Sequence, residues 1–263
     1  LGAEANDEMM EISQRVSPKL SQTSNNIFLN EKLLARVKSI YDKKEQLNLS
    51  TEDAKLLEDL YESFKANGAT LNKDDKEKYR KLSMDLSMLT LQFDQNALKD
   101  KNRFELLITD ENELSGLPES ARDAAAMLAK SKDKDGWLFN LSAPSYIPFM
   151  RYSDKRDLRE KMYREYMSVG NKGDEFDNKD IIKKIVNIRL EIAQLMGFKN
   201  YAEYALEHTM AKNSANVYKL LNQLLEAYKP IAINEYNAVE GFALGTEKEN
   251  ITVMPCLLYT SPS

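Results

Sequence analysis

The stretch DNKDIIKKIVNIRLEIAQLMGFKNYAEYALEHTMA (residues 177–211) decides the fold of this chain. Its apolar residues recur every three or four positions, which places them on one face of a helix. The run stops at Gly197, a residue suited to the left-handed turn that ends many helices. It restarts at Asn200, and Glu203 three residues later completes a capping-box-like start. The stretch therefore predicts a helix, a sharp corner and a second helix.

The helix before this corner is the predicted central helix of the molecule. Between Asn178 and Met196, its isoleucine, valine and leucine residues leave only a narrow polar arc. A helix that is apolar on nearly every side is normally buried. We therefore expect neighbouring elements to cover this helix nearly all round.

Helical spacing of apolar residues extends over most of the chain on both sides of the corner. Asn30 and Ser50 are the expected N-caps of two early helices, and Gly68 follows the second of them. Pro230 is expected to bend whatever continues toward Phe242. The other predicted helices span residues 79–97, 118–130, 154–169, 200–211 and 213–228.

Two short segments have the pattern of strands instead. RFELLIT (residues 103–109) and GWLFNLS (residues 136–142) are apolar or aromatic and flanked by turn residues. They are expected to pair across the intervening helix. In the APSYIPFMRY segment that follows, Pro144 and Pro148 argue against a continuous helix. The fold class is therefore mainly α, with a small two-stranded β element around residues 103–142.

The composition limits the classes of function. The 263 residues, 42% of them hydrophobic, can bury a sizeable core. The 37 Lys and Arg and 42 Asp and Glu residues are interspersed and sum to a net charge of -5, so we expect no nucleic-acid partner. No window approaches the ~18 uninterrupted apolar residues of a membrane span, so no membrane partner is expected. One cysteine and one histidine are too few soft ligands for a transition-metal site.

A calcium loop is the first alternative that the motifs raise. SKDKDGWLFN (residues 131–140) resembles part of such a loop, in which Gly136 would take the sixth position. The first and twelfth positions would then be Ser131 and Ser142, which lack the required carboxylates. A tight turn before a strand explains the segment better.

The single histidine and one acidic run are the remaining candidates. His208 follows Tyr204 by four residues and Tyr201 by seven, so packing with these tyrosines on one helical face is favoured over acid–base chemistry. The acidic run NKGDEFDNKD (residues 171–180) precedes the central helix, where acids favour the positive end of the helix dipole. Neither pattern selects a catalytic, cofactor-binding or metal-binding residue, so none is assigned.

Four longer stretches carry more specific information. Together they resemble the thimet oligopeptidase and peptidyl-dipeptidase family of zinc metallopeptidases, and the last is most similar to the bacterial peptidyl-dipeptidase branch. The resemblance runs from about Ile27 to Pro255. The stretches are NIFLNEKLLARVKSIYDKKEQLNLS (26–50), FELLITDENELSGLP (104–118), GWLFNLSAPSYIPFMRYSDKRDLREKMYREY (136–166) and GDEFDNKDIIKKIVNIRLEIAQLMGFKNYAEYALEHTMAKNSANV (173–217).

The resemblance implies a largely helical, two-lobed molecule with a deep channel that admits short peptides. In this family two histidines of an H-E-x-x-H helix and a later glutamate hold zinc, and this chain contains none of these residues. Residues 1–255 are therefore expected to be an N-terminal-half lobe that forms channel wall and is incomplete at both ends. Residues 256–263, CLLYTSPS, lack the periodicity and charge of the rest and are expected to be a non-native tail.

The resemblance also implies a function for the parent protein. We expect a zinc metallopeptidase that hydrolyses short peptides and releases C-terminal dipeptides, while this chain alone binds no zinc and is inactive. Its expected partners are short peptide substrates and the missing C-terminal catalytic half. An endo-acting oligopeptidase of the same family and a non-catalytic helical peptide-binding or scaffold module are the alternatives. The location, cytoplasmic or periplasmic, is left open.

Overall fold

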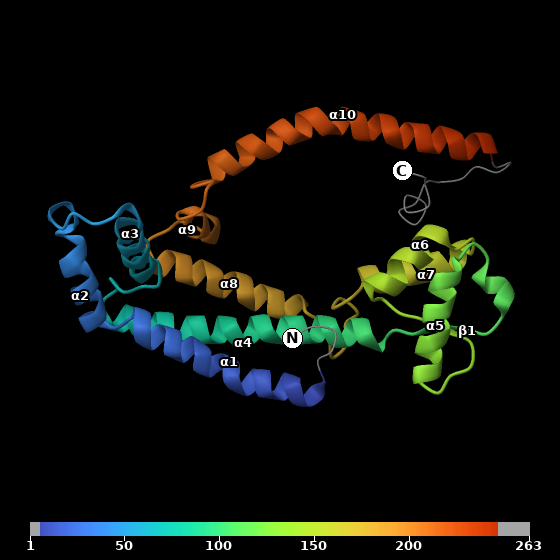
Figure 1. Cartoon of the computed structure of the whole chain (residues 1–263), viewed down its shortest axis with the longest axis horizontal. Helices are drawn as coiled ribbons and strands as arrows, with labels where there is room; N and C mark the ends of the chain where they lie inside the picture. Colours follow the sequence, from blue (N-terminus) through green and yellow to red (C-terminus); the bar gives the residue numbers. More distant parts are fainter. Residues whose placement is uncertain (1–5, 247–263) are drawn as a thin grey trace. The chain divides into compact units, whose positions relative to one another are not determined.

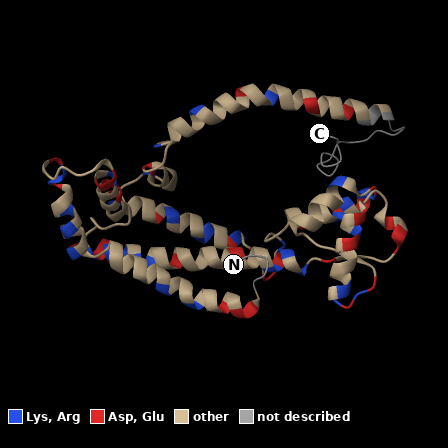
Figure 2. Ribbon diagram, in the orientation of Figure 1, with Lys and Arg blue, Asp and Glu red and all other residues tan. Residues whose placement is uncertain are grey.

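The computed structural model describes residues 6–246, and this part of the chain is mainly α-helical with one small sheet, as predicted. It divides into two compact units, which are described separately: residues 6–95 with 179–217, and residues 96–178 with 218–246. The 256–263 segment, expected to be a tail, lies outside the described residues. Lys and Arg residues are interspersed with Asp and Glu residues over much of the described chain (Figure 2). None of the helices within residues 6–246 combines the length and apolar character needed to cross a membrane.

The first unit is built around the long helix α4 (Lys73–Arg103), whose N-terminal part belongs to this unit. Helix α1 (Asp7–Phe28), which the sequence analysis did not predict, runs antiparallel beside it (Figure 1). Side-chain hydrogen bonds join the two helices, from Asn25 to Ser83 at 2.9 Å and between Ser17 and Ser87 at 2.8 Å. The other elements of this unit are α2 (Glu31–Tyr41), a short 3-10 helix (Lys44–Gln46), α3 (Thr51–Ala66), α8 (Lys179–Leu195) and α9 (Tyr201–Leu206).

Helix α8 lies on the other side of α4 and is not buried nearly all round, so that prediction was wrong. The buried face of α8 includes Ile181, Ile185 and Ile192. Ile182 and Val186 on another face are 46% and 56% exposed. Within the described part of the chain, too few elements surround α8 to cover its full circumference. The apolar spacing therefore predicted the helix correctly but not the number of its neighbours.

The corner after α8 has the predicted geometry. Gly197 adopts φ +87°, and the backbone N–H of Phe198 donates to the carbonyl of Ala193 at 2.8 Å, which closes the helix end. The Asn200 side chain accepts a hydrogen bond from the N–H of Glu203 at 3.0 Å and caps α9. Helix α9 ends at Leu206, five residues earlier than expected. The local capping residues therefore fixed the start of this helix but not its end.

The second unit holds the sheet. Strands β1 (Leu106–Ile108) and β2 (Trp137–Phe139) pair antiparallel, with Leu107 opposite Leu138, which confirms the predicted pair. The 3-10 helix Glu111–Leu114 and helix α5 (Glu119–Ser131) connect them, and α6 (Ala143–Tyr152) and α7 (Arg156–Met167) complete the core. The buried core residues include Leu106, Ile108, Leu114, Leu117, Phe139, Leu141, Phe149, Met150 and Met162.

Helix α6 corrects the expectation that two prolines would prevent a helix. Pro144 lies in the first turn, where the backbone N–H groups have no helical partner, so a proline costs little there. Pro148 lies inside the helix, where its ring removes one backbone donor. The other face of this short helix buries Tyr146, Phe149 and Met150, and this packing outweighs the cost of the proline.

Helix α10 (Ser214–Thr246) is one 33-residue helix that continues through Pro230. Figure 1 shows it as a curved element. None of its side chains that the structure describes is buried. Several large apolar side chains are half or more exposed, among them Tyr218 at 64%, Leu225 at 57% and Tyr228 at 62%. An exposed apolar stripe is unusual for a stable helix in water.

Candidate functional site

The tyrosines of the corner after α8 hold two elements together. The hydroxyl of Tyr204 donates to the carbonyl of Ala66 at the end of α3, at 2.7 Å. Its ring lies 5.8 Å from the ring of Tyr201. Burial raises the pKa of Tyr204 and, more strongly, the pKa of its neighbour Tyr79. Both hydroxyls therefore stay protonated at neutral pH and act as hydrogen-bonding groups in the packing.

His208 does not share a helical face with these tyrosines, because α9 ends at Leu206. Its Nε2 lies 3.4 Å from a carboxylate oxygen of Glu207 and 3.9 Å from one of Glu62. The side chain is 44% exposed and borders a surface depression on α3 that also includes Glu58 and Asp59. The sequence prediction that His208 packs with two tyrosines on one helical face was wrong.

The acidic run before α8 is tied into the second unit. Asp174 forms an ion pair with Arg103 at the end of α4, and this hydrogen bond lowers the pKa of the Asp174 carboxyl. Asp177 accepts a hydrogen bond from the backbone N–H of Gly173 at 2.6 Å. These contacts fix the loop between α7 and α8, so the run is structural, as the sequence analysis favoured.

A buried carboxylate beside this run escaped the sequence analysis. Asp100 is fully buried, and one of its oxygens accepts from the backbone N–H of Gly170 at 2.6 Å. The other accepts from Nε of Arg103 at 2.7 Å and from Nζ of Lys172 at 3.2 Å. Lys172 also pairs with Glu165 at 2.7 Å. With three donors around it, Asp100 is a structural anchor between α4 and the α7–α8 loop.

The segment that resembles a calcium loop is a turn before a strand, as expected. Gly136 has φ +113°, and a Cβ at this position would meet the carbonyl oxygen of Ile108 at 2.4 Å. The adjacent Lys132 and Lys134 both pair with Glu105 beside β1. The turn therefore lets the two strands approach closely, and its charged groups hold the strand ends together.

Metal-binding residues do not gather anywhere in the described part of the chain. No group of three or more His, Cys, Asp or Glu residues within residues 6–246 could hold a metal ion. The expectation that this chain alone binds no zinc remains a prediction.

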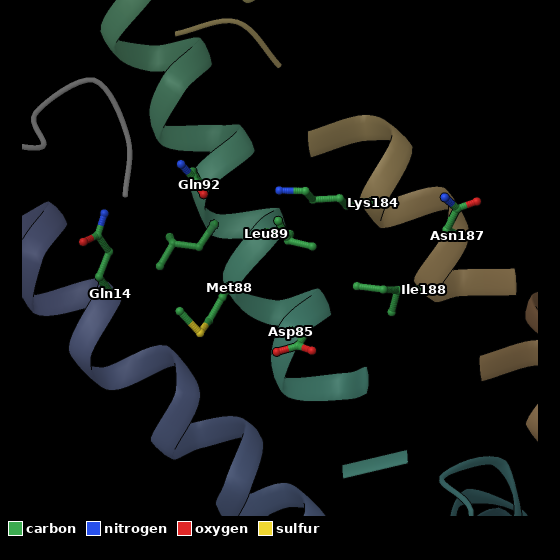
Figure 3. A pocket seen from close by; sticks show the side chains of 9 residues that line it. Gln14, Asp85, Met88, Leu89, Gln92, Lys184, Asn187 and Ile188 are labelled. Atoms are coloured by element: carbon green, nitrogen blue, oxygen red, sulfur yellow. The ribbon is translucent and has the colours of Figure 1, made fainter. Parts of the chain in front are cut away.

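A concave surface lies in the first unit, where α1, α4 and α8 meet. This groove, here called the α4 groove, has a volume of about 650 Å³. Its apolar floor is formed by Met88, Leu89, Leu91 and Ile188. Figure 3 shows polar side chains on both sides of this floor. The groove therefore combines apolar surface with polar groups, as small-ligand sites do.

Comparison with known proteins finds relatives that align with most of the chain. Residues 149–254 match the family model described as Peptidase family M3. Over 240 residues, or 90% of the chain, it is 34% identical to oligopeptidase A of Salmonella typhimurium. It is 30% identical over 239 residues to dipeptidyl carboxypeptidase of Escherichia coli. Over about nine tenths of its length, the chain is therefore similar to proteins of peptidase family M3.

The M3 relatives are considerably longer than this chain. The alignments cover 35% of oligopeptidase A of Salmonella typhimurium and 35% of dipeptidyl carboxypeptidase of Escherichia coli. A probable cytosolic oligopeptidase A of Arabidopsis thaliana is 36% identical over 213 residues, which is 78% of this chain and 30% of the relative. The chain thus spans about a third of the length of these M3 proteins. The matched family region begins inside α6 and includes α7, α8 and the described part of α10.

Proposed function

We propose that this chain is a non-catalytic part of a zinc-dependent M3 peptidase that hydrolyses short peptides. The observation that carries the proposal is the match of residues 149–254 to peptidase family M3, together with relatives named as peptidases. M3 peptidases are metallopeptidases, so the implied cofactor is zinc. Zinc in catalytic sites takes three protein ligands from His, Cys, Asp or Glu. The described residues offer no such group, so zinc does not fit this part of the molecule and its ligands are expected elsewhere in the peptidase.

The release of C-terminal dipeptides is the proposed mode of cleavage, and dipeptidyl carboxypeptidase among the relatives supports it. Endo-acting cleavage is the second candidate. It is favoured by the slightly higher identity to oligopeptidase A, 34% against 30%. The two modes are distinguished by the products from one defined hexapeptide, because only the first mode releases dipeptides solely from the C-terminal end.

The proposed partner of this chain is the remainder of the peptidase. Helix α10 supports this, because its apolar stripe is exposed and an isolated amphipathic helix gains little stability in water. Figure 2 shows few charged residues along this helix. About two thirds of the length of oligopeptidase A of Salmonella typhimurium lies outside the alignment, and the corresponding polypeptide is the occupant we assign to the α10 stripe.

A chimera tests the function. This chain replaces the matching third of oligopeptidase A of Escherichia coli, to which it is 33% identical over 240 residues. The chimera is expected to hydrolyse a fluorogenic hexapeptide when zinc is supplied, while the 263-residue chain alone is inactive with or without zinc. Zinc-dependent hydrolysis by the chain alone would overturn the non-catalytic assignment. An inactive but folded chimera would count against the peptidase function.

The α10 contact has its own matched pair of variants. Leu224→Asp places a charge on the apolar stripe, whereas Asn222→Asp places the same charge on the polar side of the helix. In the chimera, Leu224→Asp is expected to lower stability and activity strongly, and Asn222→Asp to leave both nearly unchanged. Equal effects of the two substitutions would show that the stripe is not an interface.

A further inference from the structure

The α4 groove carries polar groups that nothing in the described structure uses. Asp85, Gln92, Lys184 and Asn187 line it, and none of them makes a side-chain hydrogen bond or ion pair with another residue between positions 6 and 246. Other charged residues of the same helices are paired, such as Lys78 of α4 with Glu191 of α8 at 3.9 Å. The groove therefore presents four hydrogen-bonding side chains to an incoming ligand.

The unpaired groups are arranged with opposite charges at the two ends. Asp85 lies at one end of the groove, and Lys184 reaches from α8 toward the end marked by Gln92 (Figure 3). Met88 and Leu89 lie between these ends. This arrangement complements a ligand that has an ammonium group at one end, a carboxylate at the other and apolar groups between them.

The length of the groove matches a short extended chain. Asp85 and Gln92 are seven positions apart on α4, which at 1.5 Å per residue corresponds to about 10 Å. An extended peptide rises ~3.3 Å per residue, so about three residues span this length. The amide side chains of Gln92 and Asn187 can pair with peptide N–H and C=O groups, since a carboxamide both donates and accepts. Methionine on the floor adapts to side chains of different shape.

We propose that the α4 groove binds short peptides with free ends, about three residues long. The amino end lies at Asp85, the carboxylate lies at Lys184, and aliphatic side chains rest on the floor formed by Met88 and Leu89. This deepens the proposed function, because it places substrate or product peptide on the non-catalytic part of the peptidase. It depends on that function only for the biological source of the peptide.

Calorimetric titration of the 263-residue chain with the tripeptide Leu-Ala-Leu tests the site directly. Saturable one-to-one binding is expected, with about tenfold weaker binding when the peptide is either N-acetylated or C-amidated. Absence of binding up to about 1 mM peptide would overturn the proposal. Binding that is indifferent to both end groups would overturn it as well.

Charge variants test the orientation by coupling each protein group to one peptide end. Lys184→Glu is expected to bind the free peptide about tenfold more weakly than the parent chain does. C-amidation of the peptide is then expected to cause no further loss of affinity in this variant. Asp85→Asn is likewise expected to bind the free peptide and the N-acetylated peptide with similar affinity. If each variant instead couples to the opposite peptide end, the proposed orientation is wrong.

Two control variants separate the groove from general surface effects. Lys183→Glu changes the charge by the same amount on the neighbouring residue, which pairs with Asp180 at 3.2 Å outside the groove. Met88→Asp places a charge on the floor, where Met88 is 52% exposed, and Met127→Asp does the same on α5 in the other unit, where Met127 is 74% exposed. Lys184→Glu and Met88→Asp are expected to weaken binding, whereas their controls Lys183→Glu and Met127→Asp are expected to leave it unchanged. Circular dichroism of each variant confirms that it is folded.

The outcomes for the groove and for the peptidase function are distinguishable. Peptide binding by the chain together with an inactive chimera would leave the groove proposal standing and count against the peptidase function. An active chimera together with no peptide binding by the chain would support the peptidase function and overturn the groove proposal. The alternative occupant of the groove is the part of the peptidase that lies outside this chain. In that case Met88→Asp would destabilise the chimera, and the chain alone would bind no peptide. That combination of results would overturn the proposal.

Discussion

The core of the second unit and the helical surfaces around α8 and α10 use similar apolar residues in opposite ways. Phe149, Met150 and Met162 of the core are 0% exposed. On α8 and α10, Val186 and Leu225 are 56% and 57% exposed. Helical spacing of apolar residues is present in all these helices, so spacing marks a face that needs covering without saying what covers it. The core side chains are covered within this chain, whereas the other surfaces stay exposed in its described part and are the ones to which we assign a peptide and the rest of the peptidase as proposals.

Phe149→Ala is expected to have the largest effect, because it removes a side chain from the centre of the core. The Phe149 ring meets the Phe139 ring edge-on at 4.7 Å. A phenylalanine truncated in a core that cannot collapse costs about 3 to 5 kcal/mol of unfolding free energy. Denaturant unfolding followed by the fluorescence of Trp137, the single tryptophan and part of this core, measures the change.

Ile147→Ala is the matched control on the same helix. Ile147 is 53% exposed, so its truncation is expected to cost less than about 1 kcal/mol. Similar losses for the two variants would mean that α6 is not packed as described, and the contrast between the core and the open surfaces would then fail.

Asp100→Asn is expected to have the next largest effect. The carboxylate is fully buried and accepts from Arg103, Lys172 and the N–H of Gly170. Asparagine keeps the shape but removes the charge and turns one acceptor into a donor that faces other donors. Breaking such a buried pair costs about 2 to 4 kcal/mol. The same unfolding measurement applies, with Asp180→Asn as a control, since Asp180 is 84% exposed in its pair with Lys183. A loss as small as that of the control would show that Asp100 is not an anchor.

The sequence predicted those features that depend on neighbouring residues. Gly197, Asn200 and Glu203 defined the corner, and the turn at Gly136 defined the start of β2, because caps and turns are made by residues a few positions apart. The expectation that this chain holds no catalytic, cofactor-binding or metal-binding residue stays a prediction.

The features that the sequence did not predict depend on contacts between distant segments. Ile182 and Val186 are exposed because few elements surround α8. The residues of α8 do not determine how many elements pack against it. Pro148 is tolerated because Phe149 beside it is buried by other elements. Two of the three groups that donate to Asp100, the N–H of Gly170 and Nζ of Lys172, come from the α7–α8 loop about 70 positions later. The α4 groove likewise needs three helices from three separate parts of the sequence. Spacing within one segment contains none of this information.

Tyr204→Phe gives an intermediate effect in the first unit. It removes the hydroxyl that donates to the carbonyl of Ala66 and leaves that acceptor with one partner fewer. A hydrogen bond of this kind contributes about 1 kcal/mol, so amide protection in α9 is expected to fall about fivefold in hydrogen exchange. Tyr201→Phe is the control, because the hydrogen bond to the carbonyl of Ala66 comes from Tyr204 and not from Tyr201. Unchanged protection in Tyr204→Phe would show that the corner is held by ring packing alone.

The pH dependence of the second unit is expected to be smaller. Hydrogen bonds from Lys132 and Lys134 lower the pKa of Glu105 below its ordinary value of 4.5. Because the folded-state pKa is the lower one, these contacts stabilise the fold above about pH 4.5, and this stabilisation is lost as the pH falls through the folded-state pKa. Glu105 is partly exposed, so its contribution is less than about 1 kcal/mol.

Glu105→Gln tests this interpretation of the strand ends. The variant is expected to be less stable than the parent at neutral pH and to lose less stability between about pH 5 and pH 3. Asp59→Asn in α3 changes the net charge equally, in an exposed pair with Lys55 far along the sequence, and is expected to leave the Trp137 transition unchanged. An acid profile of Glu105→Gln that runs parallel to that of the parent would contradict the assignment.

Deletion of residues 214–263 is expected to change the stability of the core least. Helix α10 buries none of its described side chains, so the Trp137 transition is expected to shift by less than about 0.5 kcal/mol. Binding of the dye ANS is expected to fall, because the deletion removes exposed Tyr218, Leu225 and Tyr228. A large loss of core stability would show that α10 packs on the core in solution, and its stripe would then not be available to the rest of the peptidase.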